Sequence, residues 1–413
     1  PKASGNDPAT GGPDASYLGL TGYAAKMFPL ANQALANDST LGAEVLAAGN
    51  GLDSENPANV ITGQKLYQGI YSAFAPDVTG ADRAIAISIT DQATGPVGAR
   101  QRALRMYAGL DGDATLWGQQ FGQRLNTGNS AETTGYANTG FGFALGADSG
   151  DPHDGRYGAA FTFYSGDTSE KAPRTSKTLS DWVLLTGYSD WRGHGVFFDS
   201  QLSAGYGQIT GKRSIVIGNA IAECNGGETC TATGKRPAAL LAGGVTAGTI
   251  YHSGGTVFVP QLSLDGMTMR EDGYTESTPN LVTQATSGFD LHVKPFYASS
   301  LRAFAGADLR QDLKFGDYFV QPEARAGFRY DFLDGAEKLK AEFACSAVAT
   351  GSCGNTAFDI TGPDPAKGNL VLGGGIAVTT GAWSLGVSYD YLRGIDGVKS
   401  TDQTATLTLV GRI

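Results

Sequence analysis

The dominant pattern from about residue 115 to the end of the chain is strict alternation of apolar and polar positions. Between Phe319 and Phe332, even positions such as Val320, Phe328 and Tyr330 are apolar, while odd positions carry mainly Gln, Glu, Arg and Asp. A period of two residues predicts β-strands with one apolar and one polar face. Twelve strands are expected, at residues 115–125, 136–147, 156–166, 179–191, 195–209, 238–252, 256–270, 289–311, 318–332, 369–380, 382–393 and 401–413.

The connections between these strands alternate between short and long. The long ones span about 210–237, 271–288 and 333–368. Short turns on one side and long loops on the other are typical of an outer-membrane β-barrel. Residues 289–311 could instead form two strands broken at Ser299-Ser300. Thirteen strands would place the loop containing Cys345 on the short-turn side, so one long, bulged strand is expected.

The first 110 residues lack this alternation. Residues 1–13 are Gly, Pro and small polar residues, which predicts a linker. Residues 14–78 are Ala-rich, with short helices expected at 31–36, 41–48 and 64–74. Residues 79–110 predict a helix from about Asp82. Gly95-Pro96 either breaks it or starts a second helix over 97–107, because Pro suits the first turn of a helix. The barrel is expected to occupy 111–413.

The amino-acid composition limits the classes of protein to which the chain can belong. Only 17% of the residues are charged, 60 are Gly, and no apolar run approaches the ~20 residues of a membrane helix. A net charge of -10 argues against nucleic acid as a partner, because phosphate binding needs clustered Lys and Arg. A soluble all-β protein and an outer-membrane barrel remain open. The modest apolar faces, with aromatic residues near strand ends, favour the all-β transmembrane barrel.

The four cysteines form two close pairs, Cys224 with Cys230 and Cys345 with Cys353. Zinc sites usually have shorter Cys-x-x-Cys spacings and His partners, and no His lies in these segments. Two disulfides, each closing a small loop on the long-loop side, are the expected arrangement and indicate an oxidising compartment. The chain opens without a signal peptide, so we expect a mature or truncated product.

Several short motifs resemble the autotransporter β-domain of type V secretion, in order along residues 100–413. They are Leu116-Trp-Gly-Gln-Gln-Phe-Gly122, Thr139-Gly-Phe-Gly-Phe-Ala-Leu-Gly-Ala-Asp148, Asp272-Gly-Tyr-Thr-Glu276, Ser300-Leu-Arg302, Gln321-Pro-Glu-Ala-Arg325, Leu372-Gly-Gly-Gly375 and Tyr389-Asp390. The resemblance implies a 12-stranded antiparallel barrel with an N-terminal α-helix in its lumen, which moves a secreted passenger to the cell surface. Residues 14–78 would then be a passenger remnant or a helical cap.

The resemblance also implies a location and partners. The barrel would lie in the bacterial outer membrane, in contact with its lipid, with long loops extracellular and the C-terminus periplasmic. The barrel-assembly machinery and the chain's own passenger would be its protein partners. The family usually ends in an aromatic residue, whereas this chain ends in Ile413. That difference weakens the inference that the last strand is an assembly signal.

Barrel dimensions independently favour a helix in the lumen. Twelve strands ~4.8 Å apart and tilted ~40° enclose a backbone radius of roughly 12 Å, leaving about one helix diameter inside the lining side chains. Residues 82–107 would span ~39 Å as a helix. Arg100, Arg102 and Arg105 of this segment are expected to face acidic lumen residues, or alternatively to cover a solvated helix face. The expected acidic partners are Asp199, Glu323, Asp331 and Asp390.

No catalytic, cofactor or metal motif is evident. His153, His194, His252 and His292 are scattered, and we interpret Glu323, Arg325, Arg329 and Asp331 as lumen ion pairs. Some autotransporters cut their own helix through an Asn side chain. No Asn lies between Asn59 and Asn126, which makes that route improbable. Asp82 and Asp91 would suit a carboxylate-based cut, but each is more simply a helix-start or lumen-facing charge, so uncleaved attachment is preferred.

Three functions remain open at this level. The first is a non-enzymatic translocator that exports and anchors a passenger. The second is a passive channel or porin gated by the Ala-rich N-terminus. The third is a surface adhesin that binds through disulfide-stapled loops. A helix running directly into the first strand favours the translocator, because a porin does not need one.

Overall fold

The computed structural model describes most of the chain and all of the expected barrel strands. The described residues are 19–37, 67–76, 81–106, 114–129, 134–151, 153–171, 176–221, 227–278, 290–333, 338–344, 357–361 and 366–412. The linker expected at 1–13 and the helix expected at 41–48 lie outside them.

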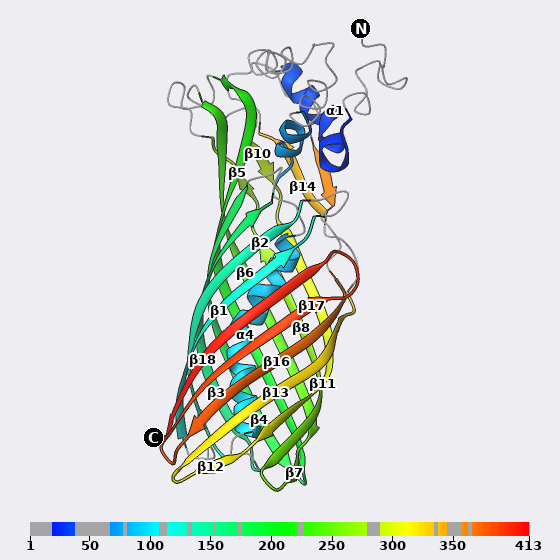
Figure 1. Cartoon of the computed structure of the whole chain (residues 1–413). Coiled ribbons are helices and arrows are strands. Elements are labelled where there is room, and N and C mark those ends of the chain that lie inside the picture. The colour runs from blue at the N-terminus through cyan, green and yellow to red at the C-terminus, as the bar shows by residue number, and fades with distance from the viewer. Residues whose placement is uncertain are drawn as a thin grey trace.

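Twelve long antiparallel strands, all within the described residues, close into one barrel (Figure 1). The strands are β1 (Ala114–Thr127), β2 (Tyr136–Ser149), β3 (Arg156–Glu170), β4 (Lys177–Gly193), β5 (Val196–Ile221), β6 (Gly227–Thr249), β8 (Thr256–Glu271), β11 (Phe296–Gln311), β13 (Tyr318–Asp331), β16 (Gly368–Thr379), β17 (Trp383–Gly394) and β18 (Ser400–Arg412). The last strand pairs with the first, from Thr115 opposite Arg412 to Thr127 opposite Ser400. The predicted 12-stranded barrel is confirmed.

The alternation in the sequence becomes two different barrel surfaces. Large apolar side chains point outward and are more than half exposed, for example Leu145, Leu185, Leu202 and Leu262. Such a continuous exposed apolar wall is unfavourable in water and fits a hydrocarbon environment. The inward faces of the same strands carry Arg, Asp, Gln, Thr and Tyr, most of them buried against the lumen contents.

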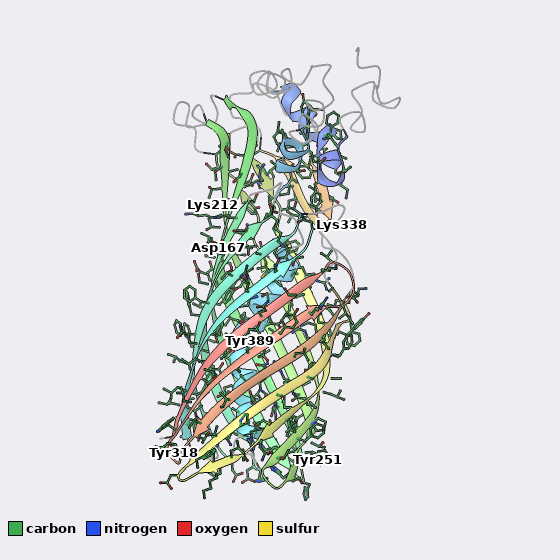
Figure 2. All side chains as sticks on the ribbon, in the orientation of Figure 1. Asp167, Lys212, Tyr251, Tyr318, Lys338 and Tyr389 are labelled. Carbon is green, nitrogen blue, oxygen red and sulfur yellow. The ribbon has the colours of Figure 1, made fainter. Side chains whose placement is uncertain are left out.

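The two rims of the barrel differ in chemistry. Tyr251 and Tyr318 lie at the lower, short-turn rim in Figure 2, where tyrosine suits a membrane–water interface. The labelled charged residues Asp167, Lys212 and Lys338 lie in the upper part, toward the long loops. The apolar band therefore occupies the lower and middle wall, and the upper strands project beyond it.

The short connections are tight hairpins. His194 and Gly195 join β4 to β5, and both have positive φ (53° and 79°). Positive φ at both central residues of a two-residue turn is the type I′ geometry that matches strand twist. Two further short strands, β7 (Tyr251–Ser253) and β12 (Leu313–Phe315), follow β6 and β11 at this rim and pair with β8 and β13.

The long connection expected at 210–237 is wrong in its extent. β5 and β6 continue pairing well beyond the barrel wall, to Val216 opposite Thr229. β4 pairs with β5 only as far as Lys177 opposite Lys212, so the upper part is a two-stranded ribbon. Glycine is a weak strand former, but cross-strand backbone pairing with Gly234 keeps Gly211 extended.

The single long strand expected at 289–311 is also wrong. The chain forms β10 (Leu291–Val293), leaves that direction at Lys294-Pro295, and only then enters β11. Proline lacks a backbone N–H and cannot continue a ladder, while Lys294 donates instead to the Lys340 carbonyl at 3.0 Å. Ser299-Ser300, the alternative break, lies inside β11 and pairs with Thr268 and Met267.

Two long connections contribute strands to a second, smaller sheet at the barrel mouth. This loop sheet consists of β9 (Tyr274–Thr275), β10, β14 (Lys338–Phe343) and β15 (Phe358–Thr361), in the order β15-β14-β10-β9. Helix α1 (Gly22–Asn37) and a helical turn over 67–73 lie beside it above the barrel (Figure 1). We call residues 19–37 and 67–76 the mouth segment.

Helix α4 (Ala81–Met106), the lumen helix, runs along the inside of the barrel (Figure 1). It is one helix with Pro96 inside it, so the break or restart expected at Gly95-Pro96 is wrong. Proline removes one helical hydrogen bond and crowds the preceding turn. Wall contacts on both sides of Pro96, from Asp91 and from Arg100, hold the two halves in line.

Candidate functional site

The candidate site is the interface between the lumen helix and the barrel wall. Twenty-six helical residues span about 39 Å, more than the ~25 Å apolar height of an outer-membrane barrel. Arg83, near the start of the helix, reaches the Leu333 carbonyl beyond the end of β13, on the long-loop side. Arg105, near its end, pairs with Asp199, which follows the short β4–β5 turn. The helix therefore crosses the barrel from the mouth to the short-turn end.

Near the short-turn end, one carboxylate organises the contact. Asp148 of β2 accepts from Arg100 Nε at 2.8 Å and Arg100 Nη2 at 2.9 Å, and from Arg156 Nη1 at 2.6 Å. The Thr115 and Tyr188 hydroxyls donate to the same carboxylate at 2.6 and 2.8 Å. All five side chains are buried, so the carboxylate is paired and hydrogen-bonded out of contact with solvent.

The last turn of the helix makes a second ionic contact. Arg105 forms an ion pair with Asp199 and donates to Gln261 Oε1 at 3.2 Å. Its guanidinium also lies 4.3 Å from the centre of the Phe197 ring, in cation–π geometry. The chain then leaves Met106 and enters β1 at Ala114, so this end is both covalently and electrostatically attached to the wall.

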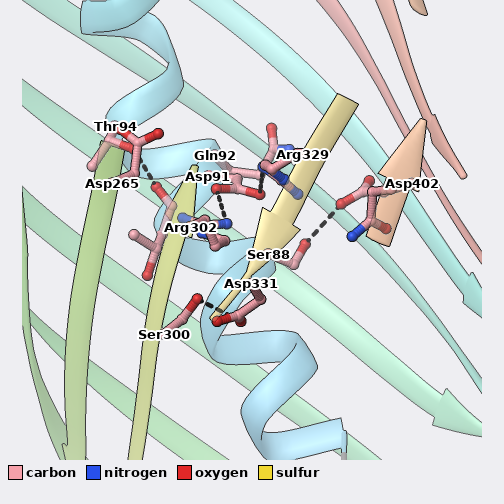
Figure 3. Close-up of polar contacts among 12 residues, drawn as sticks. Ser88, Asp91, Gln92, Thr94, Asp265, Ser300, Arg302, Arg329, Asp331 and Asp402 are labelled. Atoms are coloured by element: carbon pink, nitrogen blue, oxygen red, sulfur yellow. Dashed lines mark hydrogen bonds and ion pairs between the residues drawn. The ribbon is translucent and has the colours of Figure 1, made fainter. Parts of the chain in front are cut away.

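In the middle of the lumen, the charge arrangement is reversed, with the acid on the helix (Figure 3). Asp91 accepts from Arg302 of β11 at 2.6 Å and from Arg329 of β13 at 2.8 Å. Asp265 and Asp402 approach the same region from β8 and β18. A helix carboxylate between two wall arginines fixes the rotation of the helix at its centre.

Further hydrogen bonds surround Asp91 and its two arginine partners. Ser88 donates to Asp402 Oδ2 at 3.3 Å, and Gln92 donates to the Thr404 hydroxyl at 2.8 Å. On β3, three strands away from β18 around the barrel, Thr162 donates to the Ala93 carbonyl at 3.2 Å. Hydrogen bonds to several strands keep the helix in register and satisfy polar groups that would otherwise be buried without partners.

The outer end of the helix is tied to the β11–β13 edge. Arg83 Nη2 lies 3.4 Å from Asp331 Oδ2 and donates to the Leu333 carbonyl at 2.9 Å. Its Nε donates to the Ser299 carbonyl at 3.2 Å, and the Ser300 hydroxyl holds Asp331 at 2.8 Å. These contacts form where the helix leaves the barrel.

The fit between helix and wall is incomplete on one side. A cavity of about 250 Å³ lies between the helix and the barrel wall, lined mainly by β8, β11, β13, β17 and β18, with a few residues of β1, β5, β6 and β16. Its helix side is formed by small residues, Gly95, Gly98 and Ala99, together with Asp91 and Arg102. A cavity of this size, lined by charged groups, has room for several water molecules.

Glycines on the inner wall make room for large aromatic side chains. A Cβ at Gly142 would lie 2.4 Å from Cζ of Phe121, and one at Gly306 would lie 2.4 Å from Cζ of Phe304. The same relation joins Gly146 to Trp117. Since real contacts are not this short, these positions admit only glycine while the aromatic ring keeps its place.

The structure places the predicted lumen residues as follows. Four ion pairs include predicted residues: Arg105 with Asp199, Arg329 with Asp91, Arg325 with Asp390, and Arg83 with Asp331. Arg102 and Glu323 line one small cavity near the short-turn end. Asp331 and Asp390 therefore do not pair with Arg100 or Arg105. Arg100 instead meets Asp148, which was not among the expected partners.

Sequence reasoning missed several members of this interface. Asp148, Arg156, Arg302 and Asp402 all stand on inward faces of alternating strands, where polar and charged side chains are expected in such a barrel. The signal was present in the alternation, but pairing across the lumen depends on strand stagger and helix rotation. Neither quantity can be obtained from the spacing of residues.

Other predicted features are less visible. Cys224, Cys345 and Cys353 lie outside the described residues, and Cys230 is buried in β6, so both disulfides stay predictions. Within the described part of the chain, no three His, Cys, Asp or Glu residues are grouped as a metal site would require. No helix of the described residues is both long and apolar enough to cross a membrane.

Comparison with known proteins gives one family and several similar folds. A family model described as the autotransporter beta-domain matches residues 116–390. The translocator domain of autotransporter NalP from Neisseria meningitidis aligns with a TM-score of 0.57 and 15% identity, over 81% of this chain and 99% of that one. The β-domain of the Bordetella autotransporter BrkA aligns with a TM-score of 0.48 and 17% identity, over 73% of this chain and 100% of that one. No curated protein matches.

Proposed function

The chain belongs to the autotransporter β-domain family, and from this premise we propose that it exports a polypeptide attached upstream of the barrel and anchors it at the bacterial cell surface. Barrels of this family belong to the outer membrane. The proposal adds an orientation, with the long loops and mouth segment extracellular and the short turns and C-terminus periplasmic. It also adds a direction of transport, from the short-turn rim, where β1 begins, toward the mouth.

The course of the lumen helix is the observation that carries the proposal. Its C-terminal end continues into β1 at the short-turn rim, while its N-terminal end emerges at the mouth beside Leu333. A chain that had passed through the lumen and stopped would have this arrangement. The polar and ionic contacts of Arg83, Asp91, Arg100 and Arg105 support a defined final position for that segment.

The partners follow from the surfaces. The exposed apolar wall would contact outer-membrane lipid. The barrel-assembly machinery would recognise the last strand β18, even though the chain ends in Ile413 and not in an aromatic residue. The upstream passenger is the third partner. The proposal assigns the barrel no enzymatic step, and the helix stays attached to β1.

A passive channel is the second candidate, favoured only by the 250 Å³ cavity beside the helix. The helix occupies most of the lumen cross-section that a channel would need. An adhesin that binds through stapled loops has no supporting contact among the described residues.

Export is tested by placing a cleavable secretory signal and an epitope-tagged, unstructured passenger ahead of residue 1 in a Gram-negative host. Protease added to intact cells should remove the tag while the barrel remains folded, as judged by heat-modifiable gel migration. A matched passenger with an engineered disulfide-closed domain should stall, because the lumen admits about one helix. A tag that remains protected although the barrel is folded would contradict the proposal.

A further inference from the structure

The mouth segment and the loop sheet come from distant parts of the chain. The mouth segment precedes the lumen helix, whereas the loop sheet is built from the connections that follow β8 and β13. Side chains of both parts share one buried core, including Met27 and Ile70 on one side and Leu291 and Leu339 on the other. Burial of apolar side chains from both partners is the main source of affinity in such a contact.

Aromatic rings connect the two parts directly. Phe74 is 1% exposed and meets the Phe343 ring of β14 edge-on, with centroids 6.3 Å apart. Phe343 in turn contacts Phe358 of β15 at 5.8 Å. An edge-to-face pair such as Phe74 and Phe343 is favourable beyond its burial alone. The C-terminal end of the 67–73 turn is thereby packed onto β14, whose Phe343 ring is in turn supported by β15.

The mouth segment is also a unit in itself. Phe28 of α1 packs edge-on against Tyr71 at 4.9 Å, and the Tyr71 hydroxyl donates to Asn32 Oδ1 at 2.7 Å. Burial raises the pKa of Tyr71, which keeps this hydroxyl a donor. Gln68 exchanges two 3.0 Å hydrogen bonds with the backbone of Thr21. Both helical pieces therefore dock together.

Arg213 links the mouth segment, the barrel and the loop sheet. It lies on the part of β5 that rises beyond the wall, is 2% exposed, and donates to the Ala73 carbonyl at 2.7 Å. A cation at the C-terminal end of a helical turn meets its unpaired carbonyls. The same guanidinium pairs with Glu276, which accepts from the Leu291 backbone N–H of β10 at 3.0 Å.

From these contacts we infer that the loop sheet is a docking surface for the mouth segment, and that it retains the passenger on the barrel non-covalently when the chain is cut between residue 76 and the lumen helix. The inference rests on the proposed function, because the passenger is attached through the mouth segment. The docking contacts described above are made by residues up to Pro76 on one side and by the barrel and the loop sheet on the other, so a cut between Pro76 and Ala81 removes the covalent tie and leaves them in place.

The test inserts a specific protease site, flanked by a Gly-Ser spacer, between Pro76 and Ala81 of the full chain. The spacer is lengthened until a denaturing gel shows complete cleavage of the purified, detergent-solubilised protein. On size exclusion, the fragment carrying the mouth segment should co-elute with the barrel in equal amounts. A fragment that elutes alone after cleavage overturns the inference.

Two variants test whether the docking surface is what retains the fragment on the barrel. Phe74→Ala alters only the released fragment and leaves the barrel unchanged, and it should accelerate fragment loss about tenfold or more. Lys26→Ala, at an exposed position of α1, is the matched control and should lose fragment at the parent rate. Equal loss from the Phe74→Ala and Lys26→Ala proteins would contradict the inference.

A second pair of variants probes the wall side. Arg213→Met should also accelerate loss, whereas Arg270→Met, which removes an exposed ion pair with Asp272, should not. Heat-modifiable migration verifies that each barrel is folded. The docking test uses purified protein, so its outcome does not depend on whether export works in cells. Conversely, a fragment that fails to dock would not affect the export test.

Discussion

Arg100 of the lumen helix donates two hydrogen bonds to Asp148 of β2, one to each carboxylate oxygen, at 2.8 and 2.9 Å. Both side chains are fully buried. A bidentate pair specifies direction as well as distance, so it sets helix rotation and depth together. With Asp91 reversing the polarity at mid-lumen, the helix has one matched position in this barrel.

Replacing Asp148 should destabilise the folded barrel strongly. Asp148→Asn removes the counter-charge of the buried Arg100, and breaking a buried pair in this way costs about 3–5 kcal/mol. Urea titration in detergent, followed by tryptophan fluorescence, measures the unfolding free energy. Asp272→Asn removes a half-exposed ion pair and should change that energy by less than ~1 kcal/mol. Similar effects from both would be inconsistent with the role of Asp148.

A larger side chain at Gly142 should impair the barrel. The added Cβ of Gly142→Val would fall 2.4 Å from both the Phe121 ring and the Phe163 carbonyl, and such overpacking costs about 1–3 kcal/mol or more. Gly187→Val is the matched control, because nothing lies within 4 Å of its Cβ. Thermal unfolding by gel shift should separate the two, with Gly142→Val lower. Equal midpoints would argue against the glycine–aromatic fit.

Deleting residues 82–107 should open the barrel. A helix ~10 Å in diameter fills most of the lumen, so its removal should raise single-channel conductance in planar bilayers roughly tenfold. Deleting residues 1–18, which lie outside the lumen helix, is the control and should leave conductance low. An unchanged conductance in the helix-deleted protein would mean that something else closes the lumen.

Restoring the hydrogen bond lost at proline should stiffen the lumen helix. Pro96→Ala returns an N–H to the helix interior, where proline costs up to ~3 kcal/mol. Hydrogen exchange of residues 92–100 should slow relative to the parent protein. Pro29→Ala makes the same change within α1 and should affect only the mouth segment. Faster exchange after Pro96→Ala would show that the proline itself is needed for the fit.

Much of the barrel was predictable, because a period of two over a dozen residues has one explanation. Residues 318–332 were assigned both as a strand and by face, with Arg325 and Arg329 inward, as the structure has them. The errors occur where tertiary pairing overrides local signals. β5 and β6 continue through glycines into a ribbon, and Pro295 diverts the chain into the loop sheet.

The contacts of the helix were harder to predict than its presence. Barrel dimensions indicate a helix, and the three arginines indicate acidic partners. Which acid meets which arginine depends on register around a closed ring, where one step of stagger moves every partner. Asp199, one of the expected acids, pairs with Arg105, whereas Arg100 pairs with Asp148. The Pro96 error has the same origin, since the wall supplies contacts that an isolated helix lacks.

The most direct measurement asks on which side of the membrane each end of the lumen helix lies. An epitope placed ahead of residue 1 and, in a second protein, one inserted at the Gly254 turn are probed with antibody on intact and on permeabilised cells. The account predicts that the first is labelled on intact cells and that the second is labelled only after permeabilisation. Labelling of the Gly254 epitope on intact cells, or of the N-terminal epitope only after permeabilisation, would contradict it.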